Sequence, residues 1–285
     1  MTTTILSIQS TVAYGHAGNS AAVFPMQRLG VDVWPVITVH FSNNTSYGTW
    51  RGPLLGATDI HDVVTGIDER DVLDRVDAVL SGYQGAVDVG GEILHAVDLV
   101  KQRNPQAIYC CDPVMGDVGR GFFVRPGVPE FLRDEVVAKA DIVTPNHFEL
   151  DYLTSTTSGT LDEVLAAADQ LRATGPQTVL VTSVVHDQQQ SGTLDMIAVD
   201  DEGAWLVTTP LLDRHFTGSG DLTSAMFLTA LLAGNGTAWA LERTADIVYG
   251  VLKSTTDAGA RELRLVQAQD EIAAPSHHFG ATRLR

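Results

Sequence analysis

Lysine is scarce in this chain of 285 residues, which contains only Lys101, Lys139 and Lys253. None of the three follows a glycine, whereas a Walker A phosphate-binding loop ends in Gly-Lys-Ser or Gly-Lys-Thr. None stands in the Val-Ala-Ile-Lys context that protein kinases use. The sequence therefore excludes a P-loop nucleotide hydrolase and argues strongly against a protein kinase.

Basic residues of both kinds are outnumbered, with 18 lysines and arginines against 35 aspartates and glutamates and a formal net charge of −17. Nucleic acids and anionic membranes bind basic surfaces, so we expect neither as a partner. An anionic ligand such as a nucleotide would need local devices to hold it. Backbone N–H groups, a helix N-terminus or a metal ion can each supply the positive charge.

Cysteines and long apolar runs are also rare. Cys110 and Cys111 are adjacent, and neighbours on a strand point to opposite faces, so we predict two buried thiols rather than a disulfide or a metal pair. No run of 18 apolar residues predicts a membrane span, and the first residues lack the basic and apolar parts of a secretory signal. We expect a cytoplasmic protein with reduced cysteines.

What the chain does contain is an alternation of short β-branched runs with longer helical patterns. Strands are predicted over residues 4–9, 31–40, 78–81, 107–111, 142–144, 178–182, 193–199 and 205–209. Helices are predicted over 20–29, 58–70, 89–103, 128–138, 161–174, 221–233 and 237–258. This order predicts an α/β fold, a three-layer α/β/α sandwich around a mostly parallel central sheet. The late hairpin should add antiparallel strands at one edge, and nothing divides residues 1–285 into more than one domain.

The strongest local signal is Thr217-Gly218-Ser219-Gly220-Asp221, which opens a long apolar helix. Glycines let backbone N–H groups approach a ligand, and the helix N-terminus favours phosphate. An aspartate in the first turn can act as a general base beside that anion hole, which is the arrangement that phosphoryl transfer to an alcohol needs. The same pattern fits an ordinary helix start equally well, because aspartate is a good N-cap.

Further polar side chains follow two predicted strands, where ligands bind in open α/β sheets. Asp112 and Asp117 come after the strand 107–111, and Asn146 and Glu149 come after the strand 142–144. Oxygen ligands of this kind suit a hydrated Mg²⁺ or contacts to phosphates. An Asp-Pro turn and a helix capping box explain the same residues structurally, and both interpretations can hold together.

Three segments suit a pocket for an aromatic ligand. Residues 10–20 are predicted to be a loop after the first strand, with Asn19-Ser20 able to cap the following helix. Residues 41–52 alternate aromatic and hydroxyl side chains, which suits a small flap, although an ordinary polar hairpin fits nearly as well. Ser81-Gly82-Tyr83 ends another strand and can supply a stacking ring.

Together these segments resemble the pyridoxal kinase family of the ribokinase-like superfamily, from about residue 5 to residue 265. The most specific stretches are residues 14–24 and 39–45, and 81–83, 111–116 and 217–221 add to them. The resemblance implies Mg-ATP as phosphate donor, often a monovalent cation such as K⁺, pyridoxal as acceptor and a homodimer.

The resemblance also implies roles by position. Asp221 corresponds to the base that deprotonates the acceptor hydroxyl, with Gly218, Ser219 and Gly220 as the anion hole. The residues implied to bind the vitamer are Ser10, Thr45, Ser46, Tyr83 and Asp221. Those implied to bind ATP are Asp112, Asp117, Thr144, Glu149, Thr182 and Thr217. Those implied to organise the metal, partly through water, are Asp112, Asn146 and Glu149.

Two positions depart from the family pattern. Thr182 stands where members commonly carry a lysine near the ATP phosphates, and Asn44 stands where the flap motif commonly has a histidine. Losing the lysine removes a cation from an already acidic protein. Mg²⁺ and the anion hole would then have to balance the phosphate charge.

The leading hypothesis is ATP-dependent phosphorylation of the 5′-hydroxymethyl group of pyridoxal, with pyridoxine and pyridoxamine as further acceptors, in vitamin B6 salvage. Hydroxymethylpyrimidine kinase is an alternative, because its substrate is also an aromatic heterocycle with a hydroxymethyl group. A non-catalytic vitamin B6-binding protein is a third, motivated by Thr182 and Asn44. A sugar kinase is less favoured, because the N-terminal segment lacks a dense set of carboxylates and amides for sugar hydroxyls.

Overall fold

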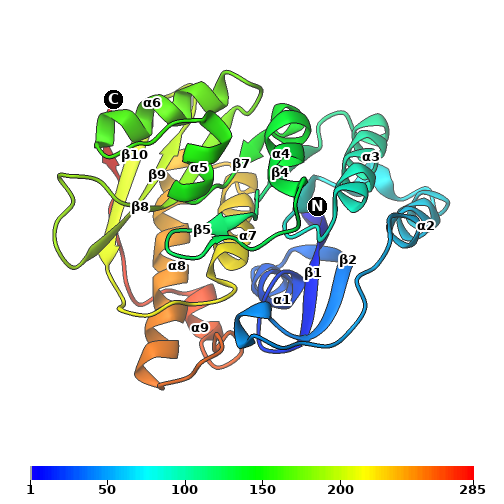
Figure 1. Ribbon diagram of the computed structural model, residues 1–285, viewed down its shortest axis with the longest axis horizontal. Helices are drawn as coiled ribbons and strands as arrows, with labels where there is room; N and C mark the ends of the chain where they lie inside the picture. Colours follow the sequence, from blue (N-terminus) through cyan, green and yellow to red (C-terminus); the bar gives the residue numbers. More distant parts are fainter. Residues whose placement is uncertain (1) are drawn as a thin grey trace.

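A computed structural model describes residues 2–285. Within them, nine strands form one twisted sheet, and six neighbouring strands of it are parallel (Figure 1). Three antiparallel strands extend one edge. In sheet order the strands are β2 (Asp32–Asn43), β1 (Thr4–Tyr14), β3 (Ala78–Ser81), β4 (Ile108–Cys111), β7 (Ile142–Val143), β8 (Thr178–Val184), β9 (Thr193–Val199), β10 (Ala204–Pro210) and β11 (Thr282–Arg283).

Helices cover both faces of this sheet. One face carries α2 (Ala57–Asp68), α3 (Val87–Arg103), α4 (Val128–Phe131), α5 (His147–Thr154) and α6 (Leu161–Arg172). The other carries α1 (Asn19–Arg28), α7 (Ser219–Leu232), α8 (Thr237–Asp257) and α9 (Gln269–Ala273). Single turns lie at Thr45–Tyr47, Leu73–Arg75 and Val137–Lys139, and a two-stranded ribbon pairs β5 (Gly116–Asp117) with β6 (Gly121–Phe122). The predicted three-layer sandwich is therefore confirmed.

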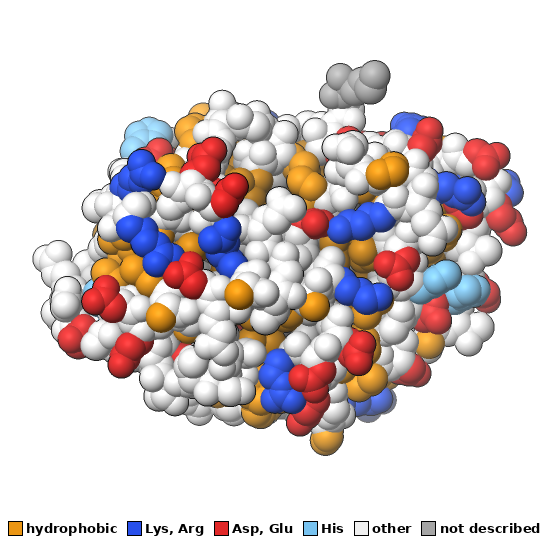
Figure 2. All heavy atoms as spheres, turned by 90° about the horizontal axis from the view of Figure 1, so that it is seen from above, with side chains coloured by type: hydrophobic (Ala, Val, Ile, Leu, Met, Phe, Trp, Pro, Cys, Tyr) orange, Lys and Arg blue, Asp and Glu red, His pale blue; other side chains and the backbone are white. Residues whose placement is uncertain are grey.

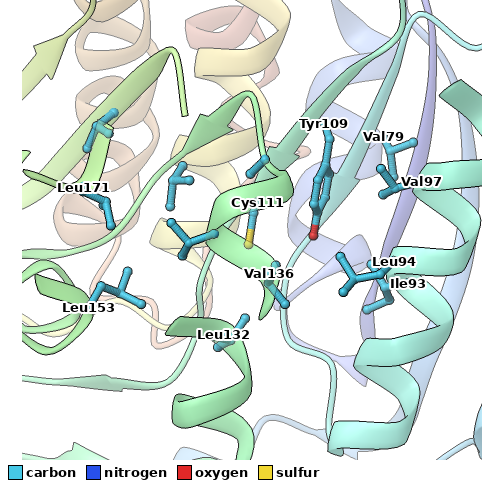
Figure 3. Packing of buried hydrophobic residues seen from close by; sticks show 14 of the residues in the cluster. Val79, Ile93, Leu94, Val97, Tyr109, Cys111, Leu132, Val136, Leu153 and Leu171 are labelled. Carbon is cyan, nitrogen blue, oxygen red and sulfur yellow. The ribbon is translucent and has the colours of Figure 1, made fainter. Parts of the chain in front are cut away.

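Two hydrophobic cores lie on opposite sides of the sheet, as strand alternation requires. Figure 3 shows Tyr109 and Cys111 of β4 among side chains of α3 and of the helical segment after α4. Cys110 belongs to the core on the other face. Both thiols are free and buried, and burial raises the pKa of Cys111 to about 12. The prediction that the two cysteines point apart is confirmed.

Three local predictions were wrong. β1 runs on to Tyr14 through a register shift between Gln9 and Thr11, so Ser10 lies in a strand rather than in a loop. Its pairing with β2 sustains the extension. Residues 128–138 are not one regular helix, because α4 passes into a π-helical turn at Leu132–Val136. Asn19 does not cap α1; its buried amide bridges β1 and β2 instead, donating to the carbonyls of Ser7, Gln9 and Val36.

Residues 41–52 leave the end of β2 and return beside it. The backbone N–H of Ser42 donates to the carbonyl of Arg51 at 2.7 Å, and that of His40 donates to the carbonyl of Pro53 at 3.0 Å. The tip contains the 3₁₀ turn Thr45–Tyr47, which the side chain of Asn44 caps. The segment therefore has two hydrogen-bonded arms and a capped tip.

The surface carries charges of both signs. On the face in Figure 2, acidic and basic side chains are interspersed. Between residues 2 and 285, no helix combines the length and the apolar character needed to cross a membrane.

Candidate active site

A cavity of about 200 Å³ opens at the carboxyl ends of the parallel strands. Every residue that the sequence singled out for a site lines it: Ser10, Thr45, Ser46, Tyr83, Asp112, Asp117, Thr144, Asn146, Glu149, Thr182, Thr217, Gly218, Ser219, Gly220 and Asp221. The structure thus brings these residues together. The role of each stays a prediction.

The order of the strands spreads these residues along the cavity. Thr182 lies on β8, Thr144 follows β7 and Asp112 follows β4, so hydroxyl and carboxylate groups occupy one end. Tyr83 follows β3 and Ser10 lies on β1, so the aromatic ring of Tyr83 lies toward the other end. Val12, Val39 and Phe41 add apolar wall there. The cavity therefore has a polar end and an aromatic end, with the start of α7 facing it.

Helix α7 begins with a turn that only glycine accommodates. Gly218 is its N-cap in the left-handed region at φ 89°, and a Cβ at this position would overlap the carbonyl oxygen of His16. The Ser219 hydroxyl fixes the turn by donating to the carbonyl of Phe216 at 2.8 Å. The first N–H groups of a helix have no partner within it, so this turn points polar hydrogens and the positive end of the helix dipole at the cavity.

Asp221 sits in the first turn of α7 and is half-buried. Burial raises the pKa of its carboxyl, while hydrogen bonds from the backbone of Gly18 and of Asp221 itself oppose that rise. A carboxylate with a raised pKa is a stronger base than one in water. The group beside the helix N-terminus is therefore suited to accept a proton from a hydroxyl.

Asp112 is buried, and its Oδ2 atom has no hydrogen-bond partner among residues 2–285. Burial, followed by the charges of Glu149 and Asp221, raises the pKa of this carboxyl well above its usual range. The Ser224 hydroxyl opposes that shift and lies 2.7 Å from the hydroxyl of Thr144. A buried orphan carboxylate oxygen costs free energy unless a ligand satisfies it, so Oδ2 of Asp112 fits a cation such as Mg²⁺.

Asn146 and Glu149 form the capping box of α5. Glu149 accepts the backbone N–H of Met115 at 2.9 Å, of Gly116 at 3.3 Å and of Asn146 at 2.9 Å. Asn146 accepts the N–H of Glu149 and donates to the Gly116 carbonyl, both at 2.9 Å. Burial raises the pKa of Glu149 to about 8 against these hydrogen bonds. Because both side chains are engaged with backbone, they suit an indirect, water-mediated metal contact better than a direct one.

Thr182 belongs to β8, and its backbone N–H donates to the carbonyl of Pro145 at 3.0 Å. No lysine lines the cavity; its basic side chains are Arg120 and His215. The Arg120 guanidinium lies over the ring of Phe123, 4.8 Å from its centroid. Sequence reasoning missed both basic residues, and the only available signal was a Gly-Arg-Gly turn shortly after Asp117.

Glu262 was missed as well. It follows α8 and accepts hydrogen bonds from His16 and Asn44, which lie more than 200 positions earlier in the chain. No local sequence pattern predicts such contacts.

Comparison with known proteins places the chain in one class of small-molecule kinases. The phosphomethylpyrimidine kinase family model, of the ribokinase-like superfamily, matches residues 59–265. A pyridoxal kinase from Rubrobacter xylanophilus is 57% identical over 98% of this chain and 97% of its own, and one from Leifsonia xyli is 53% identical over 98% and 99%. The structure of Leishmania donovani pyridoxal kinase with ADP and pyridoxamine superposes with a TM-score of 0.91, at 28% identity and 99% coverage of both chains.

The chain therefore belongs to the pyridoxal kinase family. The resemblance drawn from the five sequence segments is confirmed.

Proposed function

We propose that this protein catalyses transfer of the γ-phosphoryl group of ATP to the 5′-hydroxymethyl group of pyridoxal, producing pyridoxal 5′-phosphate in vitamin B6 salvage. The observation that carries the proposal is Asp221 at the N-terminus of α7, inside a cavity with an aromatic end and a polar end. Family membership supports it, since the similar proteins from R. xylanophilus and L. xyli are named pyridoxal kinases.

The chemistry follows from the geometry of α7. The Asp221 carboxylate accepts the proton of the 5′-hydroxyl while the hydroxyl oxygen attacks the γ-phosphorus. The bond between the γ-phosphorus and the bridging oxygen breaks, and that oxygen leaves with ADP. Backbone N–H groups of Gly218, Ser219 and Gly220 are proposed to stabilise the negative charge on the transferred group. That of Ser219 would exchange its long hydrogen bond to the Phe216 carbonyl, 3.4 Å in this structure, for the phosphate. These groups are fixed before the reaction, because Gly218 packs against His16 and the Ser219 hydroxyl holds the turn.

Mg²⁺ is the metal that we assign to the polar end. Asp112 would hold it through Oδ2, with Glu149 and Asn146 contacting it through water. When bound, the ion would neutralise part of the phosphate charge. Thr144, Thr182 and Asp117 are proposed to contact the nucleotide at the same end, and Thr217 is proposed to contact it from the turn before α7. We propose a K⁺ ion as a further source of charge there.

The vitamer occupies the aromatic end in this proposal. Ser10, Thr45 and Ser46 offer hydroxyls, and the half-buried Tyr83 offers a ring for stacking on the pyridine. Residues 41–52 serve as a flap on a single domain spanning residues 1–285. We also propose a homodimer, which the family resemblance implies, and a cytoplasmic location, where ATP is available.

A coupled ADP-release assay tests the proposal, with Mg-ATP and pyridoxal, pyridoxine, pyridoxamine or hydroxymethylpyrimidine as acceptor. We expect pyridoxal to be the best acceptor and Asp221→Asn to lower kcat by roughly 10²–10⁴-fold. Asp257→Asn is the matched control, because Asp257 pairs with Lys253 on the outside of α8. A preference for hydroxymethylpyrimidine would show that pyridoxal is not the main acceptor. Wild-type turnover by Asp221→Asn would show that Asp221 is not the general base.

A further inference from the structure

The tip of the segment 41–52 is tied to a carboxylate at the far end of the chain. Oε1 of Glu262 accepts a hydrogen bond from the Tyr47 hydroxyl at 2.7 Å and from the side-chain amide of Asn44 at 3.3 Å. Asn44 is buried, and its carbonyl oxygen accepts the backbone N–H of Ser46 at 3.1 Å. One carboxylate oxygen therefore holds both the first residue of the tip and its last.

The other oxygen of the same carboxylate holds a second segment. Oε2 of Glu262 accepts the backbone N–H of His16 at 3.2 Å. The approach is close enough to require glycine next to it, because Gly15 has φ 85° and a Cβ there would overlap the Glu262 carboxylate. Ala17, one residue beyond His16, lines the cavity. Glu262 thus joins the flap tip to the turn that follows β1.

Tyr47 is clamped from a second direction by the residue before Glu262. The Arg261 guanidinium lies over the Tyr47 ring, 3.5 Å from its centroid, and the ring of Tyr14 meets it edge-on at 6.1 Å. The hydrogen bond to Glu262 is the largest of the effects that raise the pKa of the Tyr47 phenol. Arg261 therefore contacts the ring of Tyr47, and Glu262 binds its hydroxyl.

Glu262 does not line the cavity. Of the three residues that it contacts, Asn44 lines it, and Ala17, which follows His16, and Ser46, which precedes Tyr47, line it as well. Asn44, Thr45 and Ser46 lie at the aromatic end beside Ser10, and the Thr217 hydroxyl contacts that of Ser46 at 3.4 Å. We infer that Glu262 is a positioning residue that fixes the flap tip and the turn after β1 around the vitamer, and so sets the affinity for pyridoxal. The inference rests on the proposed function for its substrate, while the anchoring itself rests on the contacts alone.

The site specifically requires a carboxylate. Three donors, from Tyr47, Asn44 and His16, converge on two oxygens. Glutamine keeps the shape of glutamate but offers one oxygen and an NH₂ group, which would face a donor. Alanine removes all three acceptor contacts. The effect should therefore grow from wild type to Glu262→Gln to Glu262→Ala, whereas Tyr47→Phe removes one contact and keeps the ring under Arg261.

Steady-state kinetics with both substrates varied separately test the inference. We expect Glu262→Ala to raise KM for pyridoxal by about ten-fold or more, the size expected for losing hydrogen bonds to a charged acceptor, with a smaller effect on KM for ATP. Tyr47→Phe should change the same parameter in the same direction. Glu271→Gln is the matched control, since it removes a carboxylate that accepts two hydrogen bonds from Ser276 outside the cavity.

Hydrogen–deuterium exchange separates this inference from the proposed function. Faster exchange in residues 41–52 of Glu262→Gln, with unchanged exchange in Glu271→Gln, is the expected result even if the wild-type protein phosphorylates none of the acceptors. Unchanged exchange would overturn the anchoring. Two results would overturn the positioning role. One is faster exchange at the flap tip without a selective rise in KM for pyridoxal. The other is an equal rise in KM for pyridoxal and for ATP, with a lower kcat and a lower Tm.

Discussion

Arg120 and His215 are exposed side chains that line the cavity and contact each other, with Nη1 of Arg120 3.4 Å from Nε2 of His215. Arg120 belongs to the turn between β5 and β6, and His215 precedes the turn that starts α7. Nδ1 of His215 lies 4.0 Å from Oδ2 of Asp117. The two basic side chains that line the cavity are therefore gathered near a predicted nucleotide residue.

Arg120 is in a position to contribute charge that the missing lysine does not. Asp112, Asp117, Glu149 and Asp221 all line the cavity, so a triphosphate entering it meets carboxylates unless cations intervene. An arginine–phosphate contact is charge-assisted and can be bidentate.

Replacing Arg120 by glutamine should accordingly raise KM for ATP by about ten-fold, a cost typical of losing one charge-assisted hydrogen bond. KM for pyridoxal should change little. Arg133→Gln serves as the control, because Arg133 pairs with Asp134 away from the cavity. Equal KM values for ATP in wild type and Arg120→Gln would show that Mg²⁺ and the helix N-terminus suffice.

Thr182→Lys tests the same charge deficit from the other side of the site. Thr182 lines the cavity from β8, and a lysine there would add an ammonium group to a cavity that four carboxylates line. We expect a lower KM for ATP, by several-fold, with a weaker dependence on Arg120. The measurement is KM for ATP in Thr182→Lys, alone and combined with Arg120→Gln. Additive effects would indicate that the two cations act independently.

Asp112 should show a trade between stability and activity. Its Oδ2 atom is buried without a partner and its pKa is raised well above the usual range, so an ionised Asp112 destabilises the metal-free fold. Asp112→Asn should raise Tm at pH 8 in the presence of EDTA, by roughly 2–4 °C for each kcal/mol recovered. The same change should weaken Mn²⁺ binding, followed by electron paramagnetic resonance, and lower kcat. A lower Tm together with unchanged Mn²⁺ affinity would rule out the metal role.

The layout of the fold followed from sequence because periodicity and turn residues are local. Strand–helix alternation gave the parallel sheet, and its carboxyl edge located the cavity that Asp112, Thr144 and Asp221 share. The extension of β1 past Gln9 could not be foreseen, since its polar residues are stabilised by pairing with β2 rather than by their own propensity.

The parts of the site that sequence did not reveal depend on contacts between distant segments. Glu262 reaches Tyr47 across 215 positions, and His215 reaches Arg120 across 95. Asn146 and Glu149 were open to a metal or a capping interpretation, and only the folded structure shows that their polar atoms are engaged with backbone. Burial likewise decides which carboxyls have raised pKa values, and burial is a property of the packed fold.

Glu149 predicts a pH dependence whose sign can be worked out. Its unfolded carboxyl releases a proton near pH 4.5, whereas burial keeps the proton on the folded carboxyl up to a pKa of about 8. Between these values the folded state binds more protons than the unfolded state, so raising the pH favours unfolding. The contribution of Glu149 to stability should therefore fall as pH rises from 5 to 8, by on the order of a few kcal/mol in metal-free protein.

Urea unfolding of Asp112→Asn and of the double variant Asp112→Asn/Glu149→Gln across that pH range, in EDTA, isolates the effect. The Asp112→Asn background removes the carboxyl whose pKa depends on the charge of Glu149, and titrating groups that do not interact with Glu149 cancel in the difference. Glutamine offers one acceptor oxygen fewer to the N–H groups of Met115, Gly116 and Asn146. This loss shifts the difference in unfolding free energy by a constant amount, so the slope of that difference with pH reports the titration of the carboxyl. The stability of the protein that keeps Glu149 should decline relative to the one with glutamine between pH 5 and 8. A flat difference would mean that the three N–H donors keep Glu149 ionised throughout, and a rising one would mean that they lower its pKa below that of the unfolded chain.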